Sequence, residues 1–280
     1  MVDKSSRYNL RLGTTLLAVL VVFLTILVPF LFWQQTWFGR VMDDKELKKS
    51  LEISAKPRKI QHALTQLSEK IAASGLSSTA VWFPAVKQLV DHPIPEVRMT
   101  VAWLMGQGDG RYNFQKYLLN LLKDTYPLVR RNAALSLVRF QDSRGRKEIR
   151  GMLLNHEIST PSDGRIKFRL DKEDPVRSGA MVARIETDGK EWITVRGIVP
   201  GYVKERMIQD GEVVSAGQPI LLIAPTEEQV WEALRAMYFI GEKKDLEVIK
   251  RFLTPNSQLS RRVQEQAFLS INSIKSKIAY

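Results

Sequence analysis

The side chains that could do catalytic or metal chemistry are few in this sequence and stand far apart. The three histidines, His62, His92 and His156, lie in different contexts, and no His-x-x-x-His or His-Glu-x-x-His spacing joins two of them. A zinc site needs such clustering, because its ligands must converge on one ion. The chain has no cysteine, which excludes disulfides, thiolate metal sites and cysteine nucleophiles. We therefore expect no metal and no cofactor.

Two further motifs lack the residues that their chemistry requires. Serine and threonine are plentiful, but no Gly-x-Ser-x-Gly elbow presents a serine nucleophile. The glycine-rich stretch Gly106 to Arg111 lacks the Gly-Lys-Ser/Thr ending of a phosphate loop, so it predicts a loop between helices. With no catalytic constellation left, the sequence predicts a protein that is not an enzyme.

What remains is a set of candidates for contact with another protein. They are aromatic and arginine residues on predicted helices: Trp82, Phe83, Trp103, Arg98, Arg130 and Arg131. Large aromatic residues and arginines dominate the energetic centres of many interfaces. Aromatic residues at helical spacing also fit a hydrophobic core. For the three aromatic candidates, a place in the core and a role in partner contact therefore both stay open.

The chain is strongly basic, with a net charge of +12. The basic residues are scattered, no run of five or more occurs, and no nucleic-acid-binding motif accompanies them. We therefore predict no nucleic-acid partner. The surplus fits an ordinary basic surface or, alternatively, attraction to anionic lipid headgroups or to an acidic partner.

Residues 44–156 show the periodicity of short amphipathic helices separated by polar breaks. A repeat of 32 residues is visible, in which Pro95-Glu96-Val97-Arg98 recurs as Pro127-Leu128-Val129-Arg130. Proline suits the first helical turn because its missing N–H is not needed there. The arginine can reach an acid or carbonyl groups at the adjoining turn. This pattern resembles HEAT repeats, and the resemblance implies helix pairs that stack into an α-solenoid.

The stretch from Pro161 to Pro225 holds two copies of one short β-unit. Each copy opens on a Gly-x-apolar step, at Gly164 and at Gly201, and reaches a second glycine before an apolar strand. From Pro175-Val176 in the first copy and Val213-Val214 in the second onward, the two copies keep an offset of 38 residues. Duplicated short strands with regularly spaced glycines predict a small closed or sandwich-like β-module.

The segment EVVSAGQPILLIA resembles the half-motif of biotinyl/lipoyl-like domains and of periplasmic adaptor (membrane fusion) proteins. Likewise, IETDGKEW resembles the hairpin of lipoyl domains. The resemblance implies a barrel-sandwich hybrid of two quasi-symmetric units. It also implies a hairpin tip at Lys190, where carrier domains bear their modified lysine. The Met-Lys-Met of biotin carriers is absent, and Gly189 separates Asp188 from Lys190. The Asp-Gly pair predicts a type I′ turn with an exposed lysine.

Residues Leu12 to Trp33 carry no charge. At about 1.5 Å per residue, a helix of this length crosses the roughly 30 Å hydrocarbon core of a bilayer. We therefore expect an uncleaved transmembrane helix that anchors the protein in lipid. Basic residues flank both sides almost equally, so charge decides little about orientation. The adaptor-like module favours the inner (cytoplasmic) membrane of a bacterium, with the bulk of the protein in the periplasm.

The predicted fold class is α+β and multidomain. The expected parts are an N-terminal tail (1–11), a transmembrane helix (12–33), a juxtamembrane linker (34–43), HEAT-like repeats (44–156), a small all-β barrel-sandwich hybrid (157–225) and C-terminal HEAT-like helices (226–280). The β-module is either inserted between repeats or placed as a junction. We expect the C-terminal helices to pack on the solenoid or on the barrel.

These parts predict a non-catalytic, membrane-anchored scaffold or accessory subunit. It would dock on a membrane protein complex through its helical repeats and β-module, with self-association as a further option. One alternative is a periplasmic adaptor of an export system, although the coiled-coil hairpin of that family is replaced here by a tight turn. A second alternative is a lipoyl- or biotin-type carrier modified on Lys190.

Overall fold

The computed structural model describes residues 17–31, 41–253 and 259–278. The chain divides into two compact units, Met1–Leu47 and Lys48–Tyr280. In the first unit, residues 17–31 form a helix. The helix α2 (Asp44–Ser50) spans the boundary between the units, and the Asp43 carboxylate caps its start by accepting a hydrogen bond from the backbone N–H of Glu46 (2.7 Å).

The predicted transmembrane helix over Leu12 to Trp33 is wrong for the part of the chain that the structure describes. No described helix is long and apolar enough to cross a membrane. The helix at residues 17–31 reaches about 22 Å at 1.5 Å per residue, which is short of the roughly 30 Å of hydrocarbon that a span must cover. Residues 12–16 and 32–33 of that prediction lie outside the described residues.

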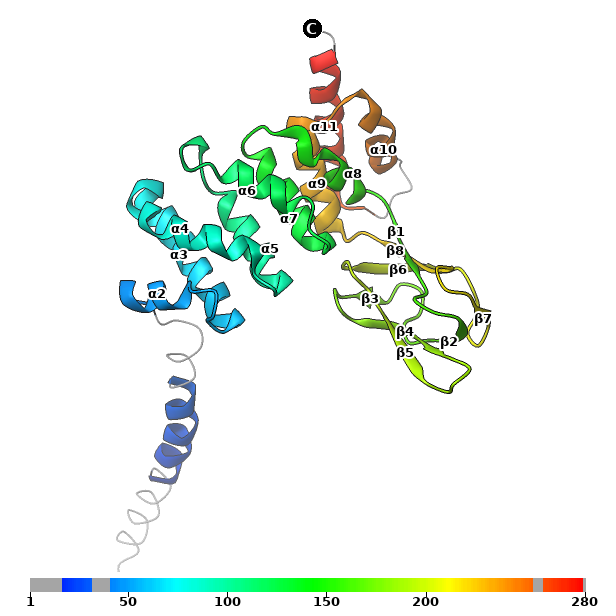
Figure 1. Ribbon diagram of the computed structural model, residues 1–280, viewed down its shortest axis with the longest axis horizontal. Helices are drawn as coiled ribbons and strands as arrows, with labels where there is room; N and C mark the ends of the chain where they lie inside the picture. The colour runs from blue at the N-terminus through cyan, green and yellow to red at the C-terminus, as the bar shows by residue number, and fades with distance from the viewer. Residues whose placement is uncertain (1–16, 32–40, 254–258, 279–280) are drawn as a thin grey trace, which may run out of the picture. The chain divides into compact units, whose positions relative to one another are not determined.

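The helical part of the second unit is a series of antiparallel pairs (Figure 1). Its helices are α3 (Pro57–Thr79), α4 (Phe83–Gln88), α5 (Pro95–Met105), α6 (Phe114–Leu121), α7 (Pro127–Val138), α8 (Arg146–Gly151), α9 (Glu227–Ile240), α10 (Leu246–Lys250) and α11 (Arg261–Ile278). Proline occupies the first turn of both α5 and α7, as the repeated Pro-x-Val-Arg pattern predicts. The second helices of consecutive pairs pack together, α5 on α7 and α9 on α11.

Buried hydroxyl groups tie these second helices together. The Ser136 Oγ on α7 donates to the carbonyl oxygen of Ala102 on α5 (2.8 Å), and the Ser270 Oγ on α11 donates to that of Leu234 on α9 (2.7 Å). A single hydrophobic core runs from α7 through α8, α9 and α10 to α11. The C-terminal helices therefore pack on the solenoid, which the sequence did not decide.

Eight strands form the β-module. They are β1 (His156–Ser159), β2 (Gly164–Phe168), β3 (Pro175–Val176), β4 (Met181–Glu186), β5 (Trp192–Arg196), β6 (Gly201–Arg206), β7 (Val213–Val214) and β8 (Pro219–Ala224). They make two antiparallel four-stranded sheets with the orders β1-β8-β6-β3 and β5-β4-β2-β7. Alternate apolar side chains from both sheets meet in one core.

The two copies of the β-unit exchange their short strands. The strand β2 of the first copy pairs with β7 of the second, at Gly164 opposite Val214. In the mirror relationship, β6 of the second copy pairs with β3 of the first, at Gly201 opposite Val176. The duplication that the sequence predicts is thus confirmed in the strand pairing, and each copy completes the sheet of the other.

The β-module is inserted inside one helical pair. The chain leaves α8, forms the module and returns as α9, and these two helices still pack against each other. The outgoing strand β1 and the returning strand β8 are antiparallel neighbours, with His156 opposite Ile223 (Figure 1). The module therefore leaves the continuity of the helical stack intact.

Candidate interaction groove

Arginines at the starts of the second helices link one helical pair to the next. Arg98 on α5 donates from Nε and Nη2 to the two carboxylate oxygens of Asp124 (2.6 and 2.8 Å). Its Nη1 donates to the carbonyl oxygen of His92 (2.7 Å), in the turn before its own helix. The guanidinium therefore fastens its own turn and the next one with a two-bond ion pair.

The same arrangement recurs one repeat later. Arg130 on α7 donates from Nη1 to the carbonyl oxygen of Asp124 (2.8 Å) and from Nε to Glu148 Oε1 (3.1 Å). Further along, Arg146 Nη1 donates to Oδ2 of the fully buried Asp245 (3.0 Å). Arg98 and Arg130, both candidates for partner contact from the sequence, thus have intramolecular partners that hold successive turns together.

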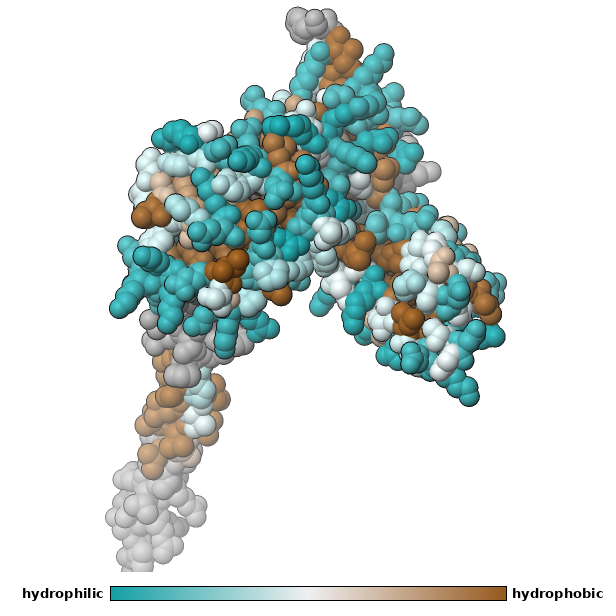
Figure 2. Space-filling view, viewed as in Figure 1, coloured by the Kyte–Doolittle hydropathy of each residue, from teal (hydrophilic) through white to brown (hydrophobic). Residues whose placement is uncertain are grey.

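An open groove of about 680 Å³ runs across the faces of α5, α7 and α9. Its lining comprises Trp103, Leu128, Arg131, Asn132, Leu135, Ser136, Val138, Arg139, Gln141, Met152, Gln229, Glu232, Arg235, Ala236 and Phe239. Two large aromatic residues of this lining are exposed, Trp103 at 42% and Phe239 at 57%. Figure 2 shows such apolar patches scattered over an otherwise hydrophilic surface. Exposed aromatics beside an apolar lining are typical of a surface that another protein covers.

Arg131 differs from its neighbour Arg130 in having no acceptor. No hydrogen bond or ion pair within the described part of the chain reaches its guanidinium, which lies in the groove lining. Burial lowers the pKa of Arg131 below its ordinary value; the nearby charge of Glu148 opposes this shift and that of Arg130 adds to it. The partly desolvated cation thus lacks the anion that would stabilise it.

The opposite wall of the groove comes from α9. Arg235 lies over the ring of Trp231, with 4.6 Å from its guanidinium carbon to the ring centroid. Burial and the charge of Glu228 raise the pKa of Glu232, against the opposing effect of Arg235 and Arg262. The arginines of this wall thus favour the ionised form of Glu232, and its burial and the neighbouring Glu228 oppose it. The positively charged side chains of the groove are three arginines, and Glu232 is its one carboxylate among the lining residues.

The HEAT-repeat family matches residues 83–159. That range covers α4 to α8 and ends with β1, so the helical repeats of this stretch match HEAT repeats. No curated protein matches the chain. Among solved structures, the apo structure of the ectoine utilization protein EutE (DoeB) from Ruegeria pomeroyi is similar at 22% identity over 25% of this chain, with a TM-score of 0.23. This chain spans 22% of the length of that one, and so low a TM-score carries no argument about fold or function.

The three aromatic candidates fall into different environments. Phe83 is a core residue, 2% exposed, whose ring makes edge contacts with Tyr112 and Phe114 at centroid distances of 4.7 and 4.9 Å. Trp82 is half-buried on the neighbouring 3₁₀ turn, away from the groove lining. Only Trp103 lines the groove. The residues that α9 contributes to the groove were not candidates from the sequence, because nothing in α9 repeats the Pro-x-Val-Arg pattern.

The histidines have local structural roles. His92 is buried, and its Nδ1 accepts a hydrogen bond from the backbone N–H of Ile94 (3.1 Å), just as Asp124 Oδ1 does from that of Tyr126 one repeat later (2.8 Å). His62 Nε2 lies 3.1 Å from the side-chain nitrogen of Gln66. Among the described residues, no group of three or more His, Cys, Asp or Glu side chains is placed to hold a metal ion.

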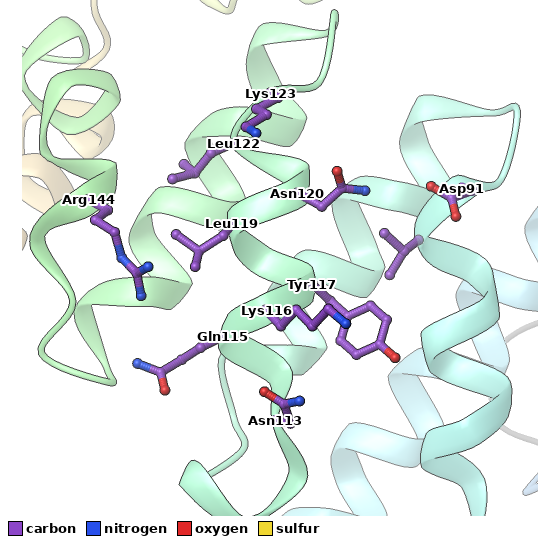
Figure 3. A pocket seen from close by; sticks show the side chains of 11 residues that line it. Asp91, Asn113, Gln115, Lys116, Tyr117, Leu119, Asn120, Leu122, Lys123 and Arg144 are labelled. Carbon is purple, nitrogen blue, oxygen red and sulfur yellow. The ribbon is translucent and has the colours of Figure 1, made fainter.

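A second, larger pocket of about 870 Å³ lies over the outer helix α6. Figure 3 shows its polar side chains, among them Asp91, Lys116, Lys123 and Arg144, spread along α6 and the neighbouring turns without converging on one point. Arg144 already pairs with Asp142 (2.5 Å). This surface therefore offers an open basic face rather than a formed site.

Lys190 lies at the tip of the β4–β5 hairpin, exposed to solvent. The predicted type I′ turn is wrong. Lys190 itself takes the left-handed conformation (φ 60°), and its N–H donates to the carbonyl oxygen of Thr187 (2.8 Å). Thr187 N–H in turn donates to Glu191 O (3.0 Å), so a three-residue loop with its left-handed residue last replaces the two-residue turn.

Proposed function

We propose that this protein is a non-catalytic scaffold or accessory subunit that holds a partner protein in the groove across α5, α7 and α9. The observation that carries the proposal is the groove itself. It combines an apolar lining, the exposed rings of Trp103 and Phe239, and the unpaired guanidinium of Arg131. Second helices of consecutive repeats commonly form the extended binding face of a solenoid.

The partner that we propose is a subunit of a membrane protein complex. Localisation at the inner membrane, with the bulk of the protein in the periplasm, stays a prediction that would follow from docking on that complex. Fractionation of native cells, with and without substitutions in the groove, tests it. If a groove variant moves from the membrane fraction to the supernatant, this supports the proposal that docking on the complex holds the protein at the membrane.

The β-module is proposed to be a biotinyl/lipoyl-like domain with a structural role. Its support is the exchange of β3 and β7 between two quasi-symmetric halves, together with the half-motif in residues 212–224. Intact-mass measurement on protein from the native host separates this role from that of a carrier. An added acyl or biotinyl mass on Lys190 would replace the structural role with the carrier hypothesis.

Site-specific photo-crosslinking tests the groove as the docking site. A benzophenone side chain at Asn132 lies in the groove lining, and one at Lys116 lies on the outer face of α6 as the matched control. We expect one partner protein to crosslink at position 132 in native membranes and not at position 116. Equal capture at both positions, or none at 132, would remove the groove from the proposal.

A further inference from the structure

We infer that the groove across α5, α7 and α9 accepts an acidic amphipathic α-helix of another protein, one carboxylate of which pairs with Arg131. This inference rests on the proposed function and adds the chemistry of the partner. It starts from the difference between Arg131 and the other arginines of the repeats. Arg98, Arg130 and Arg146 each have a carboxylate within 3.1 Å, whereas no described residue supplies one to Arg131.

The surroundings of Arg131 provide no substitute for that missing anion. The charge of Glu148 acts on Arg131, but its carboxylate accepts from Arg130. The charge of Arg131 also acts on His156: burial and this charge lower the pKa of His156, against the opposing effect of Glu157, and so favour the neutral imidazole. A guanidinium held half out of water is best stabilised by a carboxylate, which it can bind through two parallel hydrogen bonds.

The rest of the groove reinforces the preference for an acid. Arg139 and Arg235 add positive charge to the lining, and Glu232 is the one carboxylate among the lining residues. A partner segment that carries several Asp or Glu side chains meets complementary charge along the groove. A basic segment would face like charges, which cost binding energy in a partly desolvated interface.

The backbone of the groove favours a helix over an extended strand. Its lining comes mainly from α5, α7 and α9, whose peptide groups already bond within their own helices. An extended segment would have to satisfy its backbone N–H and C=O groups on side chains or water, because a helical wall offers no free strand edge. A helix satisfies its own backbone and presents apolar side chains at i, i+3, i+4 and i+7 to Leu128, Leu135 and Val138.

Selection from a phage-displayed library of random peptides of about 16 residues, long enough for roughly four helical turns, tests the inference on the full chain. We expect enriched peptides with apolar residues at helical spacing and a shared acidic position. Their affinity should fall about tenfold or more for Arg131→Gln, since one charged hydrogen-bonded pair is lost. Arg58→Gln, which removes an exposed arginine of α3, is the charge-matched control and should leave the affinity unchanged.

A double-mutant cycle completes the test. Replacing the shared acidic residue of the peptide by its amide should weaken binding to the wild type and cause no further loss with Arg131→Gln. Independent losses, or enriched peptides without a shared acid that still compete with crosslinking at position 132, would overturn the acidic partner while leaving the groove as a docking site. Failure to enrich any peptide that competes there would overturn both.

Discussion

Arg98 and Asp124 form a two-bond ion pair across a repeat boundary, with side chains only 14% and 7% exposed. Asp124 also accepts from the backbone N–H of Tyr126 at the start of α7. Replacing it by alanine leaves Nε and Nη2 of a mostly buried guanidinium, and a helix N–H, without their acceptor. We expect Asp124→Ala to lower the free energy of unfolding by about 3 kcal/mol. Urea denaturation followed by circular dichroism measures this loss.

The pair of Asp109 and Arg111 provides the matched control, because it joins the same residue types on an exposed turn. Asp109→Ala should leave the urea midpoint almost unchanged, since exposed ion pairs contribute little. Equal effects of the two alanine variants would contradict a special role for the buried ion pair of Arg98 and Asp124.

The ion pair of Arg98 and Asp124 also determines how we expect the stability of the fold to respond to acid. Burial alone raises the pKa of Asp124, but the hydrogen bonds from Arg98 and Tyr126 and the neighbouring positive charges outweigh it, so the net pKa lies below its ordinary value. A carboxyl with a depressed folded-state pKa stabilises the fold above the ordinary Asp range of about 4, and this contribution is lost as the pH falls through the folded value. Asp124→Asn should therefore lose less stability than the wild type between about pH 5 and about pH 3.

The symmetric glycines of the β-module should respond alike to alanine. A Cβ at Gly164 would overlap the carbonyl oxygen of Glu186, and a Cβ at Gly201 would overlap that of Ala224. We expect Gly164→Ala and Gly201→Ala each to cost about 2–4 kcal/mol. Gly189→Ala is the control, because its Cβ would meet only Thr187 Oγ1 at 3.9 Å. Hydrogen exchange of the backbone amides in β2 and β6 reports unfolding of this module, and a harmless Gly201→Ala would argue against the equivalence of the two copies.

Lys190 is a left-handed residue at the hairpin tip, a conformation that costs little only for glycine. Lys190→Gly should therefore raise the free energy of unfolding by about 0.5–1 kcal/mol. Lys172→Gly, at an exposed position without a positive φ, should not stabilise the module. A destabilising Lys190→Gly would mean that the lysine side chain makes contacts that outweigh its backbone strain.

The aromatic candidates should separate into one that maintains the fold and one that binds. Phe83→Ala removes a core ring and should cost about 3–5 kcal/mol. Trp103→Ala should change stability by less than about 1 kcal/mol. The same Trp103 variant should strongly reduce crosslinking from position 132, because the exposed ring is the kind of residue that anchors a partner. Normal crosslinking by the Trp103 variant would exclude that role.

Local repetition made much of the fold predictable. The recurrence of Pro95 and Arg98 as Pro127 and Arg130 identified the helical pairs and the bonds at their turns, because the same short-range geometry is used twice. The paired glycines likewise identified the duplicated β-unit. The arginine contacts lie within a few residues of their pattern, whereas each glycine pairs with a strand of the other copy, a contact that the duplication itself signals.

What the sequence missed depends on long-range packing. The groove includes Phe239 and Arg235 of α9, which the chain reaches only after the whole β-module, so no local pattern joins them to Arg131. The pairing of α8 with α9 across the insertion is equally remote in sequence. The left-handed Lys190 was missed for another reason: an Asp-Gly pair also fits a longer loop in which the residue after it carries the positive φ.

The insertion also constrains the order of folding. In an uninterrupted repeat, the two helices of a pair meet across a short turn, and that contact forms early. Here α8 and α9 are separated by residues 152–226, so their contact carries the loop-closure entropy of the whole segment unless β1 and β8 pair first. Folding of the β-module thus brings the ends of α8 and α9 together. The C-terminal half of the solenoid is expected to gain its structure only after β1 and β8 have paired.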